Sequence, residues 1–415
     1  MKANKITNIF LILSVAIFLF GSGYKLGEYN TFQNKVERPS YNIINALNPT
    51  DQTKIKNIDF SLFWQVWDKI EKKYVDKKKL DPQKMFYGAI KGLVASLEDP
   101  YTFFLTPDEN RQSKDDLGGK FEGIGAQLGL KDGRIIIVAP LKDSPAEVAG
   151  VKAGDFINKV DDQSTKNWTL TQAVSKIRGP KGSQVKLTLE RNQKELEIKI
   201  TRNQINVASV TVKYEVKDGK KVAQLSVIQF GENTNEEWDK AVSEIKNQWD
   251  KKQIKGLVLD LRDNPGGYLE GAVYLASEFL SLGKVIVKQE STTSESKTYY
   301  VLRNGQLKDI PLTILINKGS ASASEILAGA LRDNKKTRLI GEKTFGKGSV
   351  QEAIDLDEGA GLHVTVAKWI LPGGDWINSK GIEPDIKIEN QLKEGNTLTR
   401  ETDKQFDRAV DELIK

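Results

Sequence analysis

The segment NKGSASASEI places three serines just ahead of a helix-like run, where Ser320, Ser322 and Ser324 alternate with alanines. A buried strand pattern over 312–319 precedes Ser322, and a helical pattern over 322–334 follows it. A serine at a helix start is most often an N-cap. It is also well placed for nucleophilic attack, because the free N–H groups and positive dipole end of a helix stabilise a developing oxyanion.

An oxyanion needs donors next to the nucleophile. The backbone N–H of Ala323 follows the candidate serine directly, and DLRDNPGG supplies Gly266 and Gly267 at the end of another buried strand pattern. Glycine lets the backbone approach a substrate closely, although a Pro-Gly turn is also a common structural feature. Turns at the ends of two such strands predict the rim of one cleft in an open α/β sheet.

The general base is the harder question, because the chain has one His and no Cys. His363 lies in an alternating strand pattern without an acidic partner in view, which favours a structural role. Lys347, between Gly346 and Gly348, is the better candidate, since a lysine acts as a base when burial lowers its pKa. Gln351 shares its face of an extended segment and is expected to orient the amine. The alternative for Lys347 is a solvated loop lysine.

A competing hypothesis uses the same residues. The segment GEKTFGK, from Gly341 to Lys347, fits the phosphate loop pattern G-x-x-x-x-G-K. That loop requires Ser or Thr next and then a helix. Gly348 occupies the next position and a strand-like pattern follows, so the sequence argues against an NTPase.

The patterns along the chain predict several domains. Helical spacing marks 60–76 and the run from Pro82, short strands and a helix at 170–179 mark a β-rich region, and strands alternate with helices from about 205. The predicted divisions are a signal anchor at 1–27, a linker at 28–57, a helical region at 58–117, a β-rich domain at 118–203, a catalytic domain at 204–390 and a helical tail at 391–415.

Composition narrows the function classes. The 62 Lys and Arg exceed the 56 Asp and Glu, but the surplus is spread out without a basic stripe, which argues against nucleic-acid binding. The absence of Cys excludes disulfides and Cys-ligated zinc, and a single His excludes an HExxH site. No metal or other cofactor is expected.

The N-terminus has the pattern of a targeting segment. Lys2 and Lys5 precede a run from Ile6 to Leu26 whose only charge is Lys25. We expect an uncleaved signal anchor with the rest of the chain outside the cytoplasm, attached to the cell membrane. Cleavage after Gly23 is the alternative.

These strings together resemble the carboxy-terminal processing proteases, a family of bacterial and chloroplast serine endopeptidases. DLRDNPGG, NKGSASASEI and FGKGSVQ occur in the family's order, with Lys347 25 residues after Ser322 and Gln351 four residues further on. The resemblance covers nearly the whole chain from about residue 58. It implies Ser322 as nucleophile, Lys347 as general base and Gln351 as its orienter, with oxyanion donors near Gly266 or Gly267 and at Ala323.

The region 118–203 is similar to the PDZ domain that the family carries. FEGIGAQL stands where a PDZ domain binds a peptide carboxylate through backbone N–H groups while the peptide adds a strand to the sheet. The implied contacts are Gly123, Ile124, Gly125 and Ala126. Arg178 either pairs with the bound carboxylate or is a surface arginine.

The resemblance implies a multidomain α+β and α/β fold with an N-terminal helical region, a PDZ domain and a crotonase-like α/β catalytic domain. The implied reaction is metal-free peptide cleavage near the free C-termini of extracytoplasmic proteins. Two alternatives are a catalytically inactive PDZ scaffold and a crotonase-like acyl-transfer enzyme. The sequence leaves open whether the chain forms a homo-oligomer or needs an adaptor protein.

Overall fold

The computed structural model describes residues 59–141, 143–291, 295–390 and 398–414, and these fall into two compact units that divide between Asp81 and Pro82. The predicted anchor and linker lie outside the described residues. In the described part of the first unit, α2 (Ser61–Lys73) carries the aromatic side chains that predicted it. The rings of Phe63 and Trp64 contact each other with centroids 5.0 Å apart, and the short helix η1 (Lys77–Lys79) follows.

The second unit begins with α3 (Pro82–Ala95), as the proline predicted. Strand β1 (Phe103–Leu105) and helix α4 (Pro107–Leu117) come next. Thr106 caps α4 by accepting from the Glu109 N–H, and the Glu109 side chain accepts from the Thr106 N–H in return. This reciprocal cap fixes where β1 ends and α4 begins.

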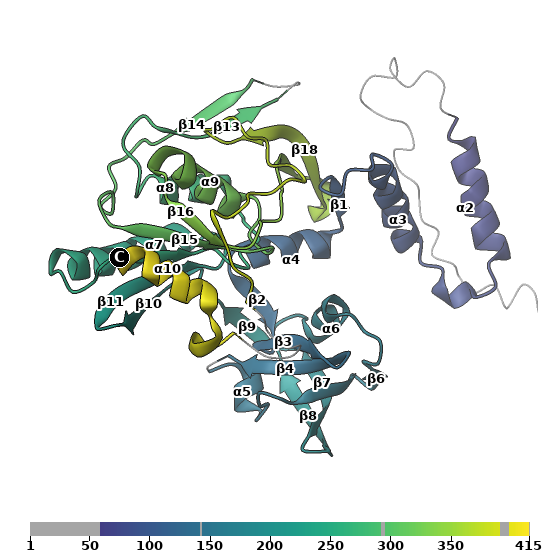
Figure 1. Ribbon diagram of the computed structural model, residues 1–415. Coiled ribbons are helices and arrows are strands. Elements are labelled where there is room, and N and C mark those ends of the chain that lie inside the picture. Colours follow the sequence, from purple (N-terminus) through teal and green to yellow (C-terminus); the bar gives the residue numbers. More distant parts are fainter. Residues whose placement is uncertain (1–58, 142, 292–294, 391–397, 415) are drawn as a thin grey trace, which may run out of the picture. The chain divides into compact units, whose positions relative to one another are not determined.

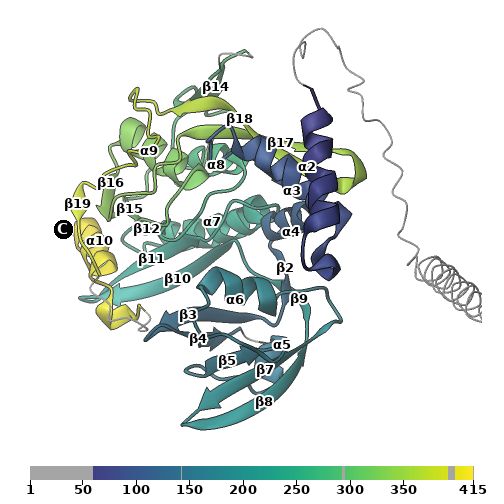
Figure 2. The ribbon, with the colours of Figure 1, turned by 90° about the vertical axis from the view of Figure 1, so that its right-hand side faces the viewer.

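The β-rich domain is an antiparallel sheet in the order β3-β4-β5-β7-β8 with two helices packed on it (Figure 2). The pair Asp132-Gly133, with positive φ at both residues, makes the tight β3–β4 turn. Its elements are β3 (Ala126–Lys131), β4 (Arg134–Pro140), α5 (Pro145–Val148), β5 (Phe156–Val160), β6 (Gln163–Ser164), α6 (Leu170–Ile177), β7 (Gln184–Arg191) and β8 (Lys194–Thr201). The flanking strands β2 (Lys120–Gly123) and β9 (Asn203–Asn206) pair with each other.

The main sheet has the order β10-β11-β12-β15-β16-β19, and every pair except β10–β11 is parallel (Figure 1). Its strands are β10 (Val210–Lys217), β11 (Lys220–Val227), β12 (Leu257–Asp260), β15 (Leu312–Ile316), β16 (Arg338–Gly341) and β19 (Ile386–Lys387). The predicted βα alternation is confirmed, because helices join the parallel strands.

Helices cover both faces of this sheet. Alternate side chains of β12 face opposite ways, so Leu257 and Leu259 join the core under one set of helices while Val258 packs with Phe406 of the C-terminal helix. The first set comprises α7 (Thr234–Asp250), α8 (Leu269–Ala276) and α9 (Ala323–Lys335), and the opposite face is covered by α10 (Lys404–Ile414).

A second sheet was only partly predicted. Strand β18 (Gly361–Ile370) pairs with β1, β13 and β17, and β14 extends the sheet beyond β13. The strands added to it are β13 (Val285–Glu290), β14 (Lys297–Tyr300) and β17 (Ser349–Asp355), and the short helices η2 (Asp357–Gly359) and η3 (Arg400–Thr402) complete the described elements. The β1–β18 pairing sets Phe103 opposite His363, which adds the segment around β1 to this second sheet.

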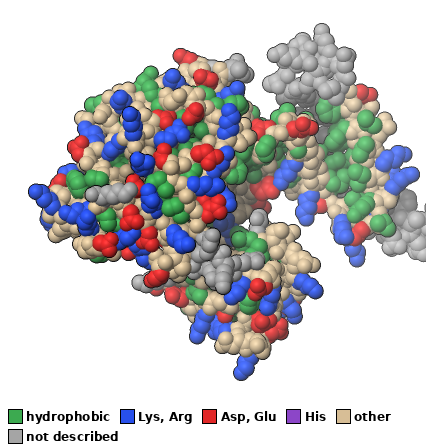
Figure 3. Space-filling view, viewed as in Figure 1, with side chains coloured by type: hydrophobic (Ala, Val, Ile, Leu, Met, Phe, Trp, Pro, Cys, Tyr) green, Lys and Arg blue, Asp and Glu red, His purple; other side chains and the backbone are tan. Residues whose placement is uncertain are grey.

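The multidomain fold class is therefore confirmed, while the finer domain boundaries stay predictions. On the face shown in Figure 3, Lys and Arg side chains are mixed with Asp and Glu rather than gathered into a stripe.

Candidate active site

Ser322 lies at the junction of β15 and α9, as the sequence predicted. Its backbone has φ 55° and ψ −116°, a conformation that side-chain-bearing residues rarely adopt and that costs on the order of 1–3 kcal/mol. An ordinary N-cap residue has extended backbone instead. The half-buried side chain thus projects from a strained turn at the N-terminus of a helix, a geometry found at functional sites.

The neighbouring serines are engaged elsewhere. Ser320 is fully buried and its hydroxyl donates to the Leu261 carbonyl at 2.8 Å. Ser324 is also fully buried and donates to the carbonyls of Asn264 and Ala321. These contacts tie the serine segment to the turn after β12, so both residues act as supports.

The glycine turn packs directly against Ser322. A Cβ added to Gly266 would lie 2.7 Å from the Ser322 Cβ, and one added to Gly267 would lie 2.1 Å from the Phe230 carbonyl oxygen. Both positions have positive φ. Only glycine fits this close approach, which explains the NPGG sequence.

The buried side chain of Asn264 orders the same turn. Its Nδ2 donates to the Val227 carbonyl at 2.7 Å, and its Oδ1 accepts from the Gly266 N–H at 2.8 Å. Of the two glycines that the sequence offers as oxyanion donors, Gly266 therefore has its N–H engaged by the Asn264 side chain. Within the described residues, the N–H groups of Gly267 and Ala323 have no hydrogen-bond partner, so they are the two donors available beside Ser322.

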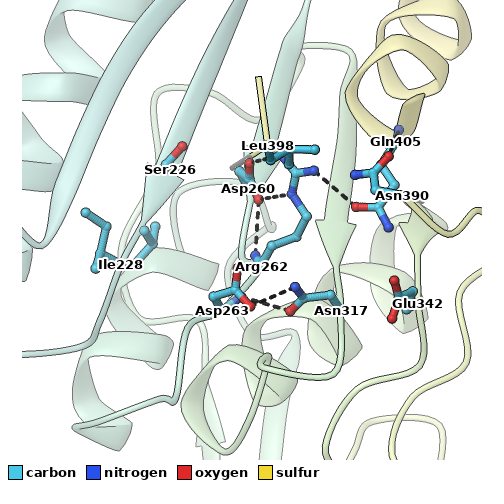
Figure 4. Close-up of a pocket in the computed structure, with 11 residues that line it drawn as sticks. Ser226, Ile228, Asp260, Arg262, Asp263, Asn317, Glu342, Asn390, Leu398 and Gln405 are labelled. Carbon is cyan, nitrogen blue, oxygen red and sulfur yellow. Dashed lines mark hydrogen bonds and ion pairs between the residues drawn. The ribbon is translucent and has the colours of Figure 1, made fainter. Parts of the chain in front are cut away.

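Arg262 anchors the strand end from which this turn emerges (Figure 4). Its Nε and Nη2 bind the carboxylate of Asp260, as Figure 4 shows. Its Nη1 and Nη2 bind the carboxylate of Asp403 at 2.9 Å each. All three side chains are about nine-tenths buried. Burial alone would lower the pKa of Arg262, but the two carboxylates outweigh it and raise that pKa. The C-terminal segment is thereby fixed to the end of β12.

Glu325 joins the serine segment to the lysine loop. Its fully buried carboxylate accepts from the Ser322 N–H at 2.9 Å through Oε2, and from the N–H groups of Lys347 at 3.0 Å and Gly346 at 2.8 Å. The Thr344 hydroxyl donates to Oε1 at 2.5 Å. One carboxylate thus sets the backbone of both predicted catalytic residues.

Lys347 follows β16 in a tightly packed loop. A Cβ on Gly346 would lie 2.7 Å from the Gly381 nitrogen, and one on Gly348 would lie 2.4 Å from the Asn378 nitrogen. This close packing buries much of Lys347, and burial lowers the pKa of its amine against the opposing charge of Asp99. Strand β17 follows the loop where a phosphate loop would need a helix, so the NTPase hypothesis is excluded.

The amine of Lys347 does not touch the Ser322 hydroxyl in this structure. Its Nζ lies 5.0 Å from the centroid of the Tyr101 ring, and within the described residues no hydrogen bond joins it to Ser322. Gln351 lines the same cavity, and in the described part of the chain it also makes no hydrogen bond to the lysine. Its Nε2 donates to the hydroxyls of Ser349 at 2.8 Å and Thr365 at 3.2 Å, which leaves its Oε1 as an acceptor.

A cavity of about 1,100 Å³ brings the predicted catalytic residues together. Its lining includes Gly266, Gly267, Ser322, Ala323, Lys347 and Gln351. His363 also lines it, stacked on Phe103 at 4.7 Å, and burial together with the charge of Lys347 lowers its pKa. A neutral, stacked histidine agrees with the structural role expected for it.

A second cavity, of about 300 Å³, lies in the β-rich domain between β3 and α6. All five predicted peptide-binding residues line it: Gly123, Ile124, Gly125, Ala126 and Arg178. The Arg178 guanidinium is already paired, because its Nη1 donates to both oxygens of Asp116 in α4 at 2.9 Å. It also lies over the Phe121 ring at 4.9 Å.

Three contributors to the site were not singled out from the sequence. Glu325 sits three residues after Ser322, and the S-x-x-E spacing of a capping box was the signal that could have revealed it. Asn264 and Tyr101 carry no comparable signal, because their contacts depend on the tertiary fold. Among the described residues, no group of three or more His, Asp or Glu side chains is arranged to hold a metal.

Comparisons with known proteins agree with this architecture. Residues 221–388 match peptidase family S41, residues 136–191 match the PDZ domain, and residues 19–109 match the activating protease CtpB N-terminal domain. These matches define a serine-type peptidase that carries a PDZ domain.

The relatives are more specific. The chain is 35% identical over 383 residues to the carboxy-terminal processing protease CtpB of Bacillus subtilis, covering 92% of this chain and 78% of that protein. It is 40% identical over 329 residues to CtpA of the same organism, covering 78% and 69%. The chain therefore belongs to the carboxy-terminal processing proteases.

Solved structures give the same result. The photosystem II D1 C-terminal processing protease matches with a TM-score of 0.51 and 30% identity, over 79% of this chain and 92% of that one. A putative S41 protease from Bacteroides fragilis matches with a TM-score of 0.53 over 84% and 96%, and its 16% identity makes it evidence for the fold alone.

Proposed function

We propose that this chain is an endopeptidase that cuts protein substrates near their C-termini, with Ser322 as nucleophile and Lys347 as general base. One observation carries the proposal. The N–H groups of Gly267 and Ala323, which have no hydrogen-bond partner among the described residues, lie beside Ser322 in a cavity that Lys347 also lines. Those two donors stabilise an oxyanion, and a partly buried lysine is a base suited to a serine.

The reaction follows from these positions. Neutral Lys347 takes the proton of the Ser322 hydroxyl as Oγ bonds to the peptide carbonyl carbon, and the carbonyl oxygen becomes an oxyanion held by Gly267 and Ala323. The C–N bond then breaks, and the Lys347 ammonium gives its proton to the leaving amine. Water attacks the acyl-enzyme with Lys347 again as base, which releases the acid and restores Ser322. Each step conserves protons and needs no metal.

Two further groups complete the proposed site. Gln351 has both amide hydrogens engaged, so its Oε1 is the atom proposed to orient Lys347 by accepting from Nζ. The PDZ cavity, with the backbone of Gly123 to Ala126 along its wall, is the proposed receptor for the substrate's C-terminus.

We also propose an extracytoplasmic location with the N-terminal segment as membrane anchor. The predicted span lies outside the described residues, and none of the helices in the described ranges is long and apolar enough to cross a membrane. The argument rests on the charge and hydropathy pattern of the first 27 residues. Deleting them should release the protein from the membrane fraction of cells, and unchanged fractionation would contradict the anchor.

The decisive experiment incubates the full chain with an unstructured protein that ends in apolar residues. Ser322→Ala and Lys347→Ala should abolish cleavage, whereas Lys343→Ala, which removes a half-exposed lysine of the same loop, should leave it intact. Because only neutral lysine is a base, activity should rise with pH. Burial of Lys347 places the midpoint below the ordinary value of 10.5.

The outcomes separate the alternatives. Cleavage that survives Lys347→Ala would contradict the lysine as base, and activity lost on adding a chelator would contradict a metal-free mechanism. Substrate that binds without being cut by any form would favour the PDZ scaffold. The match to peptidase family S41 sets the acyl-transfer alternative aside.

A further inference from the structure

The Lys347 amine is held by a part of the chain outside the matched peptidase region. Residues 99–102, Asp-Pro-Tyr-Thr, form a turn that ends where β1 begins. They lie in the segment 19–109 that matches the CtpB N-terminal domain, whereas the match to peptidase family S41 covers 221–388. Pairing of β1 with β18 brings this turn to the cavity that holds the catalytic residues. The turn therefore reaches the site through tertiary contacts only.

The contact with Lys347 is specific. Nζ lies 5.0 Å from the Tyr101 ring centroid, within the range of a cation–π interaction. This interaction strengthens when water is excluded, and the side chain of Lys347 is partly buried. Since no hydrogen bond joins Nζ to Ser322 in the described residues, the Tyr101 ring is the direct neighbour that favours a charged amine.

The turn is rigid and negatively charged. One Asp99 oxygen accepts from the Tyr101 N–H at 3.0 Å and the other from the Thr102 hydroxyl at 2.7 Å. The Thr102 hydroxyl in turn accepts from the Thr365 N–H of β18 at 3.0 Å. Burial would raise the pKa of Asp99, but hydrogen bonds from Thr365, Thr102 and Tyr101 lower it, so the carboxylate stays ionised.

Other titratable groups face Lys347 but are committed elsewhere. The Glu325 carboxylate from α9 is saturated by three N–H groups and one hydroxyl. His363 from β18 is stacked on Phe103, and burial keeps it neutral near pH 7. Asp99 is the carboxylate whose opposing charge acts on the Lys347 amine, and Tyr101 is the ring that contacts it.

We propose that the Asp99–Thr102 turn is a positioning element of the catalytic site, which receives the Lys347 ammonium when Ser322 gives up its proton. Charge appears on Lys347 at the same moment as the oxyanion forms. A neighbouring carboxylate and ring stabilise that charge, as the aspartate of a Ser-His-Asp triad stabilises its imidazolium. Tyr101 sets the place of Nζ, and Asp99 supplies the opposing charge.

The inference rests on the proposed Ser322–Lys347 mechanism. Its test measures the reactivity of Ser322 with a reagent that does not require peptide binding. The rate at which a small fluorophosphonate inactivates the full chain is measured across pH. Removing the Asp99 charge makes protonated Lys347 less favourable. Asp99→Asn should therefore move the acid-side midpoint to lower pH by roughly half to one unit and lower the plateau rate.

Two variants of Tyr101 separate the effect of its aromatic ring from an effect on folding. Tyr101→Phe keeps the ring and should leave the midpoint unchanged, while Tyr101→Leu removes it and should move the midpoint down by a smaller amount than Asp99→Asn. Thermal unfolding of each variant checks that the fold persists.

The outcomes distinguish this inference from the mechanism beneath it. If Asp99→Asn and Tyr101→Leu lower the rate equally at every pH with the midpoint unmoved, the turn is merely structural and the inference is wrong. If Lys347→Ala retains the full inactivation rate, the proposed base itself is wrong. If Lys347→Ala is not inactivated and the Asp99 and Tyr101 variants show shifted midpoints, both the mechanism and the role of the turn are supported.

Discussion

Among the arginine–aspartate pairs of this protein, one lies at the end of β12, next to the glycine turn, and another lies at the PDZ cavity. Arg262 uses three nitrogens on two carboxylates, and the side chains of Arg262, Asp260 and Asp403 are about 9–10% exposed. Arg178 uses one nitrogen on Asp116, with exposures of 29% and 37%. The two pairs share a chemistry and differ in solvent access.

That difference predicts different roles. A buried, fully hydrogen-bonded ion pair is costly to break, because the charge left behind has no water to solvate it. A half-exposed pair contributes about 0–1 kcal/mol and can be exchanged for another partner. We infer that Arg262 makes a permanent structural ion pair in the main sheet. The Arg178–Asp116 pair, in contrast, is able to open so that Arg178 binds a ligand carboxylate.

The largest expected effect on stability comes from breaking the buried ion pairs of Arg262. Arg262→Met leaves Asp260 and Asp403 buried without the arginine charge that balances them, which should lower the free energy of unfolding by about 3–5 kcal/mol in denaturant titration. Burial would raise the pKa of Asp403, but hydrogen bonds and the charge of Arg262 lower it below 3.8. The pair therefore stabilises the parent above about pH 4 and less as pH falls through the lowered value. If the variant is as stable as the parent at pH 7, Arg262 does not hold the sheet and the C-terminal segment together in the way proposed.

A somewhat smaller effect is expected at Glu325. In Glu325→Gln, an amide NH₂ replaces one oxygen and faces N–H donors, so at least one buried donor loses its acceptor. We expect kcat to fall about 100-fold, because the backbones of Ser322 and Lys347 are both displaced, and stability to fall by about 1–3 kcal/mol. Steady-state kinetics on a fluorogenic peptide checks this.

The matched control for Glu325 is a carboxylate elsewhere in the cleft. Glu352→Gln changes an exposed cleft-lining residue and should leave kcat within about twofold, as expected for an exposed position. Equal losses in the two variants would show that cleft charge, rather than backbone placement, governs the rate.

The same contrast explains what could be predicted from the sequence. Ser322, Gly267 and Lys347 follow strand patterns, and parallel strands end at one edge of a sheet, so local signals were enough to bring them together. The engagement of the Gly266 N–H by Asn264 is a matter of hydrogen-bond geometry within a turn, which no spacing reveals.

Contacts between segments that are distant in the sequence could not be predicted for a related reason. Tyr101 meets Lys347 because β1 pairs with β18, and no local pattern specifies the partner of a three-residue strand. The Arg178–Asp116 pair also joins segments 62 residues apart. Sequence patterning predicts faces and ends of elements well, whereas pairings across the fold require the structure.

The smallest effect is expected at the exposed Arg178–Asp116 pair. This prediction gives the sharpest test of whether the two arginines have different roles. Asp116→Asn frees Arg178, so a peptide with a free C-terminal carboxylate should bind roughly fivefold tighter while its C-terminal amide binds as before. Arg178→Ala should remove the preference for the acid and change stability by less than about 1 kcal/mol. Fluorescence anisotropy with the two peptides measures both. An acid-to-amide ratio unaffected by either substitution would make Arg178 a structural tie to α4, and the two arginines would then differ in burial but not in role.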